Sequence, residues 1–357
     1  MTLTNLTLLR RAVQLLAFVF LVYGAAVMGV YAADKLSGAL PSLACAYDEK
    51  GADYCALIPL QHQVGHGLGR AMDSGNWLMF FLPILTTLGT FLLMFVVLNK
   101  AFCGWICPLG FFQEVVHLIG QKLGLRNVNR LSDSWVDKLR PVKWLMLGVL
   151  VFGLPALSSL GFVSKELGDP FCKICPSRIM TTLVSGTNEQ LYVDTASYPY
   201  MALSVIGDFL FGLMVAMALT LRQPFCRICP LLAMHALFRK LGMARLVKQG
   251  SARCDKCGLC AQACPMDIRE LQTDFNDTDK PQDITLADCT LCGRCVEFCP
   301  DKDVLQIRYL NLPLFSADPQ YFKQRNKAQK SWDKISITDL TVRPVTKAAK
   351  PGKGGSA

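Results

Sequence analysis

The sequence predicts an α-helical polytopic membrane protein, with about four transmembrane helices, that also carries a small cysteine-rich α+β domain. The composition supports the membrane part, because 52% of the 357 residues are hydrophobic and only 18% are charged. Soluble domains carry about 25% charged residues. The cysteines support the second part, because eight of the 16 lie in two copies of one spacing pattern between residues 254 and 299.

Four apolar runs reach or approach the length of about 20 residues that spans a bilayer as a helix. They cover residues 12–33, 77–98, 144–163 and 201–221. The first run follows Arg10 and Arg11 and ends in small residues, as a secretory signal peptide does. It is longer than the usual apolar segment of about 7–15 residues, so we expect a retained anchor. The membrane domain then covers residues 1–245.

Lys and Arg are unevenly distributed over the loops between these runs. The loop between the second and third runs holds seven of them, whereas each of the other two loops holds three. The positive-inside rule therefore places the seven-charge loop in the cytoplasm, together with the N-terminus and everything after residue 221. The net charge of +10 is largely this bias. No basic stripe with interleaved aromatic residues predicts nucleic-acid binding.

The domain at residues 246–310 contains the pattern Cys-x-x-Cys-x-x-Cys-x-x-x-Cys-Pro twice. The first copy is Cys254, Cys257, Cys260 and Cys264, and the second is Cys289, Cys292, Cys295 and Cys299. This spacing is that of bacterial two-cluster ferredoxins, so it predicts two [4Fe–4S] clusters. The fourth cysteine of each copy ligates the other cluster, so Cys299 completes the first and Cys264 the second. Structural zinc sites also use Cys-x-x-Cys, but they leave the third cysteine and the proline without a role.

A second cysteine motif follows three of the apolar runs. It reads Phe-Cys-x-x-x-Cys-Pro once and Phe-Cys-x-x-Cys-Pro twice, with the cysteine pairs Cys103 and Cys107, Cys172 and Cys175, and Cys226 and Cys229. Proline can simply end each helix, and small buried cysteines can pack the helix ends. Three repeats make that interpretation weak. Thiolate pairs from two helix ends can instead ligate a further metal centre, above all Fe–S, or act as a dithiol redox couple.

The charge count places four cysteines on the outer face, namely Cys45, Cys55, Cys172 and Cys175. In an oxidising compartment the usual outcome is one or two disulfides that close short loops. The phrase Pro-Phe-Cys-x-Ile-Cys-Pro at 170–176 also occurs at 224–230, which favours a shared role as metal ligands. The sequence leaves both interpretations open.

Together these motifs resemble the NapH/NosR/CcoG type of polytopic membrane ferredoxin. The resemblance covers roughly residues 77–300, where a Cys-x-x-x-Cys-Pro-Leu-Gly motif, a second such motif and a C-terminal ferredoxin follow one another. It carries over to Cys103, Cys107, Cys226, Cys229 and the eight ferredoxin cysteines. The chain departs from that pattern in its second motif, which is one residue shorter, and in its additional cysteines at 45, 55, 172 and 175.

The resemblance implies a bacterial inner-membrane protein whose clusters face the cytoplasm. We therefore predict a membrane-bound iron–sulfur protein that passes electrons between the quinone pool and a redox partner, as an electron-transfer subunit of the quinol dehydrogenase kind. Its expected partners are membrane lipid, quinone, other redox subunits and a periplasmic reductase or dehydrogenase. The alternative is a redox assembly factor that reduces a metal or thiol during maturation of another metalloenzyme. Residues 311–357 are polar and basic, so we expect a disordered tail.

Asp208 lies inside the fourth apolar run, toward its outer end. An ionised side chain in the membrane costs about 2.5–3.5 kcal/mol on insertion scales, so it usually faces a polar cavity or a partner. One interpretation is a proton acceptor beside a quinol, which makes Asp208 the candidate catalytic residue. The other is a hydrogen bond to a hydroxyl such as that of Thr86, Thr87 or Ser159.

The four histidines show no ligand pattern. His62 and His66 share one predicted helix face, with no third ligand nearby. His117 and His235 each follow a Cys-Pro motif on an apolar helix, where we expect packed rather than ligating side chains. The glycine-rich run at 65–69 lacks the strand that precedes a dinucleotide site.

Overall fold

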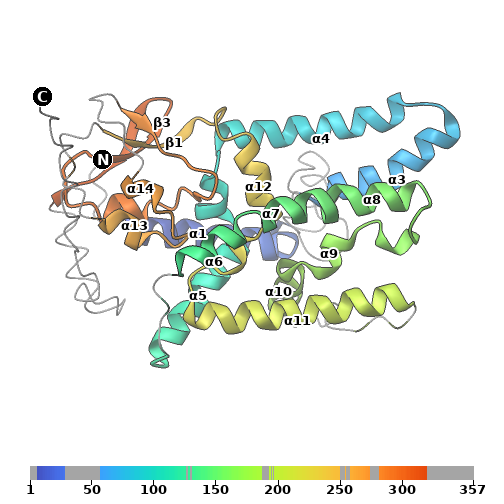
Figure 1. The fold of residues 1–357 in the computed structure, drawn as a ribbon, viewed down its shortest axis with the longest axis horizontal. Coiled ribbons are helices and arrows are strands. Elements are labelled where there is room, and N and C mark those ends of the chain that lie inside the picture. The colour runs from blue at the N-terminus through green and yellow to red at the C-terminus, as the bar shows by residue number, and fades with distance from the viewer. Residues whose placement is uncertain are drawn as a thin grey trace, which may run out of the picture.

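The computed structural model describes residues 6–28, 57–125, 128, 131–186, 193, 195, 197–249, 254, 258–273 and 281–319. Cys45, Cys55 and Cys257 lie outside the described residues, as do the side chains of His62 and His66. Long helices form one end of the molecule, and a small sheet with short helices forms the other (Figure 1). This is the predicted fold class, and it is confirmed.

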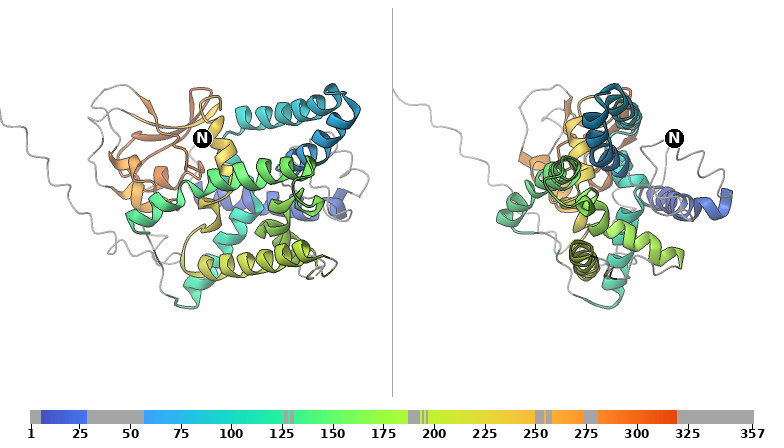
Figure 2. Two further views of the ribbon diagram at one scale, coloured as in Figure 1. Left: turned by 45° about the vertical axis from the view of Figure 1, so that its right-hand side comes forward. Right: turned by 90° about the vertical axis from the view of Figure 1, so that its right-hand side faces the viewer.

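Four helical segments are long and apolar enough to cross a membrane: Leu6–Tyr23, Phe80–Val97, Ser134–Ser159 and Tyr198–Thr220. They belong to α1 (Leu6–Met28), α4 (Leu78–Val97), the run from α6 to α8, and α11 (Tyr198–Thr220). Large apolar side chains such as Leu85 and Phe209 are exposed along them, which suits contact with lipid. α4 and α11 are seen nearly end-on when the molecule is turned by 90° (Figure 2).

The third span is wound in four different pieces. α6 (Asp133–Leu139) and α7 (Val142–Met146) are followed by the π-helix η3 (Leu147–Gly153) and by α8 (Leu154–Ser159). A π-helical stretch leaves backbone carbonyls without their usual α-helical partner. One of these, the carbonyl of Leu150, accepts a hydrogen bond of 2.8 Å from Gln61 Nε2.

α3 (Ile58–Ser74) packs against both α4 and α8. A Cβ atom on Gly69 would lie 2.8 Å from the backbone oxygen of Ser159, and the Gly69 N–H donates to the Ser159 hydroxyl at 2.6 Å. A Cβ on Gly65 would lie 3.0 Å from the Gly168 oxygen. The glycine-rich run is therefore a helix-packing face.

The chain turns back into the bundle between α8 and α11. This segment contains the 3₁₀ turn η4 (Lys165–Leu167), α9 (Pro170–Ile174) and α10 (Pro176–Ser185), and α9 and α10 lie between α8 and α11 (Figure 1). Both of its cysteines, Cys172 and Cys175, are buried. Phe171, Ile174 and Met180 of this segment belong to the hydrophobic core, so the pair lies inside the bundle, and its position on the outer face of the membrane stays a prediction.

α5 (Pro108–Lys122) lies across the ends of the spans that face the ferredoxin (Figures 1 and 2). It follows the π-helix η2 (Phe102–Ile106) and crosses the end of α11 closely, since a Cβ on Gly120 would lie 2.0 Å from the Leu219 oxygen. After α11 come the 3₁₀ turn η6 (Phe225–Arg227) and α12 (Pro230–Leu237).

The ferredoxin domain has a four-stranded sheet of order β2-β1-β3-β4, antiparallel throughout. Its strands are β1 (Ala244–Lys248), β2 (Gln282–Asp283), β3 (Leu305–Tyr309) and β4 (Leu312–Ser316). Short helices α13 (Leu259–Ala263), α14 (Glu270–Thr273) and α15 (Arg294–Glu297) cover it. The sheet begins at Ala244 and ends at Ser316, whereas the predicted domain covers 246–310, so β4 lies in the stretch predicted as the start of the tail.

Gly207 tests the packing of the buried segment 170–185. A Cβ at this position of α11 would lie 2.7 Å from the Lys173 backbone oxygen, whereas one at Gly212 on the same helix meets nothing within 4 Å. We expect Gly207→Ala to destabilise the protein by about 1–3 kcal/mol, because overpacking forces the backbone apart. Gly212→Ala should have little effect or raise stability. Equal thermal unfolding midpoints of the two variants in detergent would contradict this packing.

Candidate iron–sulfur centres

The ferredoxin cysteines form two groups. The pKa of Cys295 is raised well above its ordinary value, mainly by burial. Four neighbouring thiols raise it further, those of Cys292, Cys289, Cys264 and Cys260. These five thiols therefore lie close enough to act on one another. Cys264, the last cysteine of the first copy, lies among those of the second.

The last cysteine of the second copy lies with the first copy. The pKa of Cys299 is raised to about 12, mainly by burial, and the thiols of Cys260 and Cys254 contribute to this rise. This exchange of fourth cysteines is the arrangement in which each copy completes the cluster of the other.

The sequence pattern distinguishes these thiols from a structural zinc site, because each copy has a third cysteine and a proline that a zinc site would leave without a role.

Each Cys-Pro motif of the helical domain starts a helix in the same way. Cys107, Cys175 and Cys229 are the N-cap residues of α5, α10 and α12, with ψ of 116°, 119° and 124°, and proline follows at the first helical position. Proline is preorganised for that position, where its missing N–H is not needed. The repeat thus places a sulfur at a helix N-terminus, where the helix dipole favours a thiolate.

Backbone N–H groups support these sulfurs. Burial raises the pKa of Cys107, while hydrogen bonds from the N–H groups of Gly110 and Leu109 oppose that rise. Cys264 of the ferredoxin has a similar backbone, with φ −70° and ψ 121°. The Cys-Pro motifs of the helical domain therefore share their local geometry with a predicted cluster ligand.

The motifs of unequal length are accommodated by helical winding. The longer one forms the π-helix η2, in which the N–H of Cys107 donates to the Phe102 oxygen at 2.9 Å. The shorter motif of Cys226 and Cys229 forms the tighter 3₁₀ turn η6. The wider π-helical turn accommodates the extra residue of the longer motif, so Cys107 and Cys229 both become N-cap residues.

The two motifs bring Cys103, Cys107, Cys226 and Cys229 together, and we refer to these residues as the membrane quartet. Burial raises the pKa of Cys103 well above its ordinary value, and the thiols of Cys107, Cys229 and Cys226 raise it further. Four partly buried thiols so close together favour a bound cation, which allows them to ionise.

Gln113 of α5 holds the Cys226 turn. Its Nε2 lies 3.5 Å from Cys226 Sγ, and its Oε1 accepts a hydrogen bond of 3.0 Å from the N–H of Phe225. Nothing in the sequence marks Gln113, because a glutamine on an apolar helix carries no ligand signal.

Cys175 extends the quartet into the bundle. The pKa of Cys175 is raised to about 12, mainly by burial, and the thiols of Cys229 and Cys107 contribute to this rise. Cys172 donates to Gln61 Oε1 at 3.0 Å. Within the described residues, no disulfide joins Cys172 to Cys175.

A buried cation lies between the quartet and the ferredoxin. Lys100 Nζ donates to the carbonyls of Leu286 and Ala287, directly before Cys289. Burial lowers the pKa of Lys100 to about 8, although the thiols of Cys289 and Cys103 oppose this, so the side chain is still mostly protonated at pH 7. In the sequence Lys100 is one of seven basic residues that indicate topology, and nothing distinguishes it from the others.

Backbone contacts and ion pairs complete the junction. A Cβ on Gly104 would lie 2.3 Å from the Thr290 oxygen, and Trp105 Nε1 donates to the Leu291 oxygen at 2.9 Å. Several ion pairs also cross between the domains, namely Lys143–Asp288, Arg140–Glu270, Arg140–Asp288 and Arg227–Asp267. The second ferredoxin copy is thus held directly against the first Cys-Pro motif.

Asp208 is half-buried on α11, and its Oδ1 atom has no hydrogen-bond partner among the described residues. Thr86, Thr87 and Ser159 each have a hydrogen bond to another group. Both interpretations of Asp208 stay predictions. Asp208 follows Gly207, where α11 packs against α9.

The two histidines with described side chains are packed. His117 Nδ1 lies 3.2 Å from the Ala218 oxygen. The ring of His235 lies 4.5 Å from that of Phe95 and 5.9 Å from that of Phe102. Burial lowers the pKa of His235 to about 3, which keeps it neutral.

Comparison with known proteins assigns families to three stretches of the chain. The family described as 4Fe-4S binding domain matches residues 80–126 and 203–248, so each match holds one span and the Cys-Pro motif after it. The family described as 4Fe-4S dicluster domain matches residues 246–300. These matches support iron–sulfur clusters in this protein.

Similar proteins are ferredoxin-type. NapH of Haemophilus influenzae is 26% identical over 206 residues, 57% of this chain and 61% of its own. The resemblance to NapH-type membrane ferredoxins is confirmed. YccM of Escherichia coli, whose name provisionally assigns it to electron transport, is 26% identical over 217 residues, 60% of this chain and 53% of its own. MauN of Methylobacillus flagellatus, a methylamine utilization ferredoxin-type protein, is 25% identical over 168 residues, 47% of this chain and 48% of its own.

The chain spans about half to three fifths of the length of these relatives. No solved structure matches it. The arrangement of the junction is therefore described from the geometry of this chain alone.

Lys100 tests the junction. Lys100→Met keeps most of the side-chain volume but leaves the Leu286 and Ala287 carbonyls without their donor. We expect a loss of about 1–3 kcal/mol in the free energy of unfolding, because each buried acceptor needs a partner. Lys122→Met, at an exposed position of α5, is the control and should change little. Thermal unfolding in detergent measures both, and equal midpoints would refute a structural role for Lys100.

Proposed function

We propose that this protein conducts electrons between its two ferredoxin clusters and a further centre held by the membrane quartet, and so links the quinone pool to a redox partner. An iron–sulfur electron-transfer role is supported by the family matches and by the NapH and MauN relatives. The observation that carries the finer proposal is the direct contact of the Cys289 loop with the Cys103 motif, with Lys100 donating to the loop.

The residues at the junction suit this role. Clusters of this kind supply one-electron transfer, with potentials set by burial, charge and hydrogen bonds to sulfur. The chain provides all three at the quartet: partly buried thiols, the cation of Lys100 and the amide of Gln113 beside Cys226. Gly104 lets the two motifs meet without an intervening side chain.

The buried pair of Cys172 and Cys175 lengthens the proposed path. Cys175 lies near Cys229 and Cys107, so the path continues from the quartet into the bundle. Cys45 and Cys55 lie outside the described residues and remain candidates for completing this end. Asp208, on the helix that packs against α9, is the proposed proton acceptor for a quinol.

Charge supports the proposed orientation, and the resemblance supports the proposed location and partners. The seven-charge loop favours a cytoplasmic ferredoxin. The likeness to NapH supports spans in a bacterial inner membrane. The redox partner is then another subunit or a periplasmic reductase or dehydrogenase. A role as assembly factor would instead direct the electrons to a metal or thiol of a client protein.

The quartet can be tested with the double variant Cys107→Ser, Cys229→Ser. We expect iron to fall by about four per chain, because one cubane is lost, while the ferredoxin EPR signals remain. Electron transfer from quinol to the ferredoxin clusters should fall to background, and reduction by dithionite should continue. Wild-type iron content and rate would mean that these cysteines only pack helix ends. Metal loss from a client protein when the gene is deleted, without quinol-dependent reduction of the clusters in the wild type, would favour the assembly role.

Asp208→Asn keeps the shape of the side chain and removes its ability to accept a proton. We expect slower quinol-dependent reduction of the clusters, by tenfold or more, as for loss of a general base. Reduction by dithionite should be unchanged, because it bypasses the quinol. Asp73→Asn, at an exposed position of α3, is the matched control. If Asp208→Asn behaves like the control, the carboxyl has only a packing role.

A further inference from the structure

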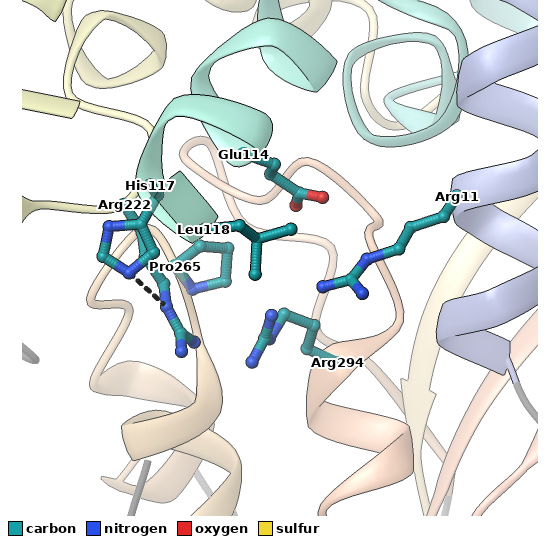
Figure 3. Close-up of a pocket in the computed structure, with 7 residues that line it drawn as sticks. All are labelled: Arg11, Glu114, His117, Leu118, Arg222, Pro265 and Arg294. Atoms are coloured by element: carbon teal, nitrogen blue, oxygen red, sulfur yellow. Dashed lines mark hydrogen bonds between the residues drawn. The ribbon is translucent and has the colours of Figure 1, made fainter. Parts of the chain in front are cut away.

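A basic pocket lies where the helical bundle meets the ferredoxin domain (Figure 3). Segments far apart in the sequence contribute to it: α1, α5, the segment after α11, the turn after α13, and α15. The lining residues are Arg11, Glu114, His117, Leu118, Arg222, Pro265 and Arg294. The proposed electron path uses none of these side chains.

Positive charge exceeds negative charge in this pocket. Glu114 is the only carboxylate among the described lining residues, and it already pairs with the fully buried Arg10 at 2.9 Å. The guanidinium groups of Arg11 and Arg294 point toward the same space (Figure 3). Like charges held together in a partly buried site repel one another, so an anion that enters between them is stabilised.

The pocket lies at the level where the spans end. Arg11 belongs to the first span, Leu6–Tyr23, and Arg222 follows the fourth, Tyr198–Thr220, by two residues. Phosphate groups of lipids occupy this level in a membrane, beside the ends of the apolar core.

Exposed apolar side chains also lie near the pocket at the end of α5. Leu118 lines the pocket, while Ile119 on this helix and Leu123 directly after it are 47% and 69% exposed. The acyl chains of a lipid whose phosphate is in the pocket would meet apolar residues of the same helix.

We propose that this pocket binds the phosphate of an anionic phospholipid. Arginine is suited to this task because its planar guanidinium group donates two parallel hydrogen bonds to phosphate oxygens. Basic pockets beside the cytoplasmic ends of transmembrane helices are typical headgroup sites. The lipid bridges α1, α5 and α15, and so ties the ferredoxin to the membrane surface. This proposal requires no cluster in the membrane quartet.

Native mass spectrometry of the detergent-solubilised full chain tests it, with phosphatidylglycerol and phosphatidylcholine titrated separately. We expect one molecule of phosphatidylglycerol to bind at least tenfold more tightly than phosphatidylcholine. The double variant Arg11→Gln, Arg222→Gln should lose roughly tenfold or more of this affinity, because each basic residue near a membrane surface contributes about fivefold. Arg11→Gln alone, at a half-buried position, should lose about fivefold.

The control removes two positive charges at the other end of the bundle, with Arg70→Gln and Lys165→Gln, and should bind phosphatidylglycerol as the wild type does. Far-UV circular dichroism and iron content show whether each variant is folded. Equal losses in the control and the test variant would overturn the proposal. It would also be overturned if inorganic phosphate alone displaced the lipid from the wild type at equal concentration, since the ligand would then be free phosphate.

Discussion

The contact between Gly104 and the second ferredoxin loop is the constraint on which the rest of the structure depends. The backbone of the π-helix η2 approaches the Thr290 oxygen so closely that no side chain fits between them. Lys100, before the helix, and Trp105, within it, each donate to backbone oxygens of the same loop. The backbone of the Cys103 motif therefore contacts the backbone of the Cys289 loop directly, without a side chain between them.

This junction is stabilised mostly by groups that are buried. Lys100 and Lys143 are almost completely excluded from solvent, and both face the ferredoxin loop that contains Asp288. A buried charge that loses its partner costs several kcal/mol, whereas an exposed pair contributes little. The domains are thus held in one relative position, and not as two bodies on a flexible linker.

Much of the architecture could be predicted from sequence, because spans and ferredoxin copies have strong local patterns. Apolar length alone identified four spans. The segment with Cys172 and Cys175 could not be placed in the same way, because charge counting assigns every stretch between spans to one face of the membrane. Its burial depends on tertiary contacts, such as the close approach of Gly207 to the Lys173 oxygen. The roles of Lys100 and Gln113 could not be predicted from sequence, because they depend on partners more than 100 residues away.

The first helix of this protein makes its contacts with almost the last part of the chain. Thr7 on α1 donates to Glu297 on α15, across 290 residues, and Gly293 packs against Leu6. At a synthesis rate of about 5–20 residues per second, the ribosome needs roughly 15–60 s to deliver that partner. During this interval the α1 surface around the buried Arg10 lacks its contact with α15. The contact between α1 and α15 therefore forms only after nearly all of the ferredoxin domain has been synthesised.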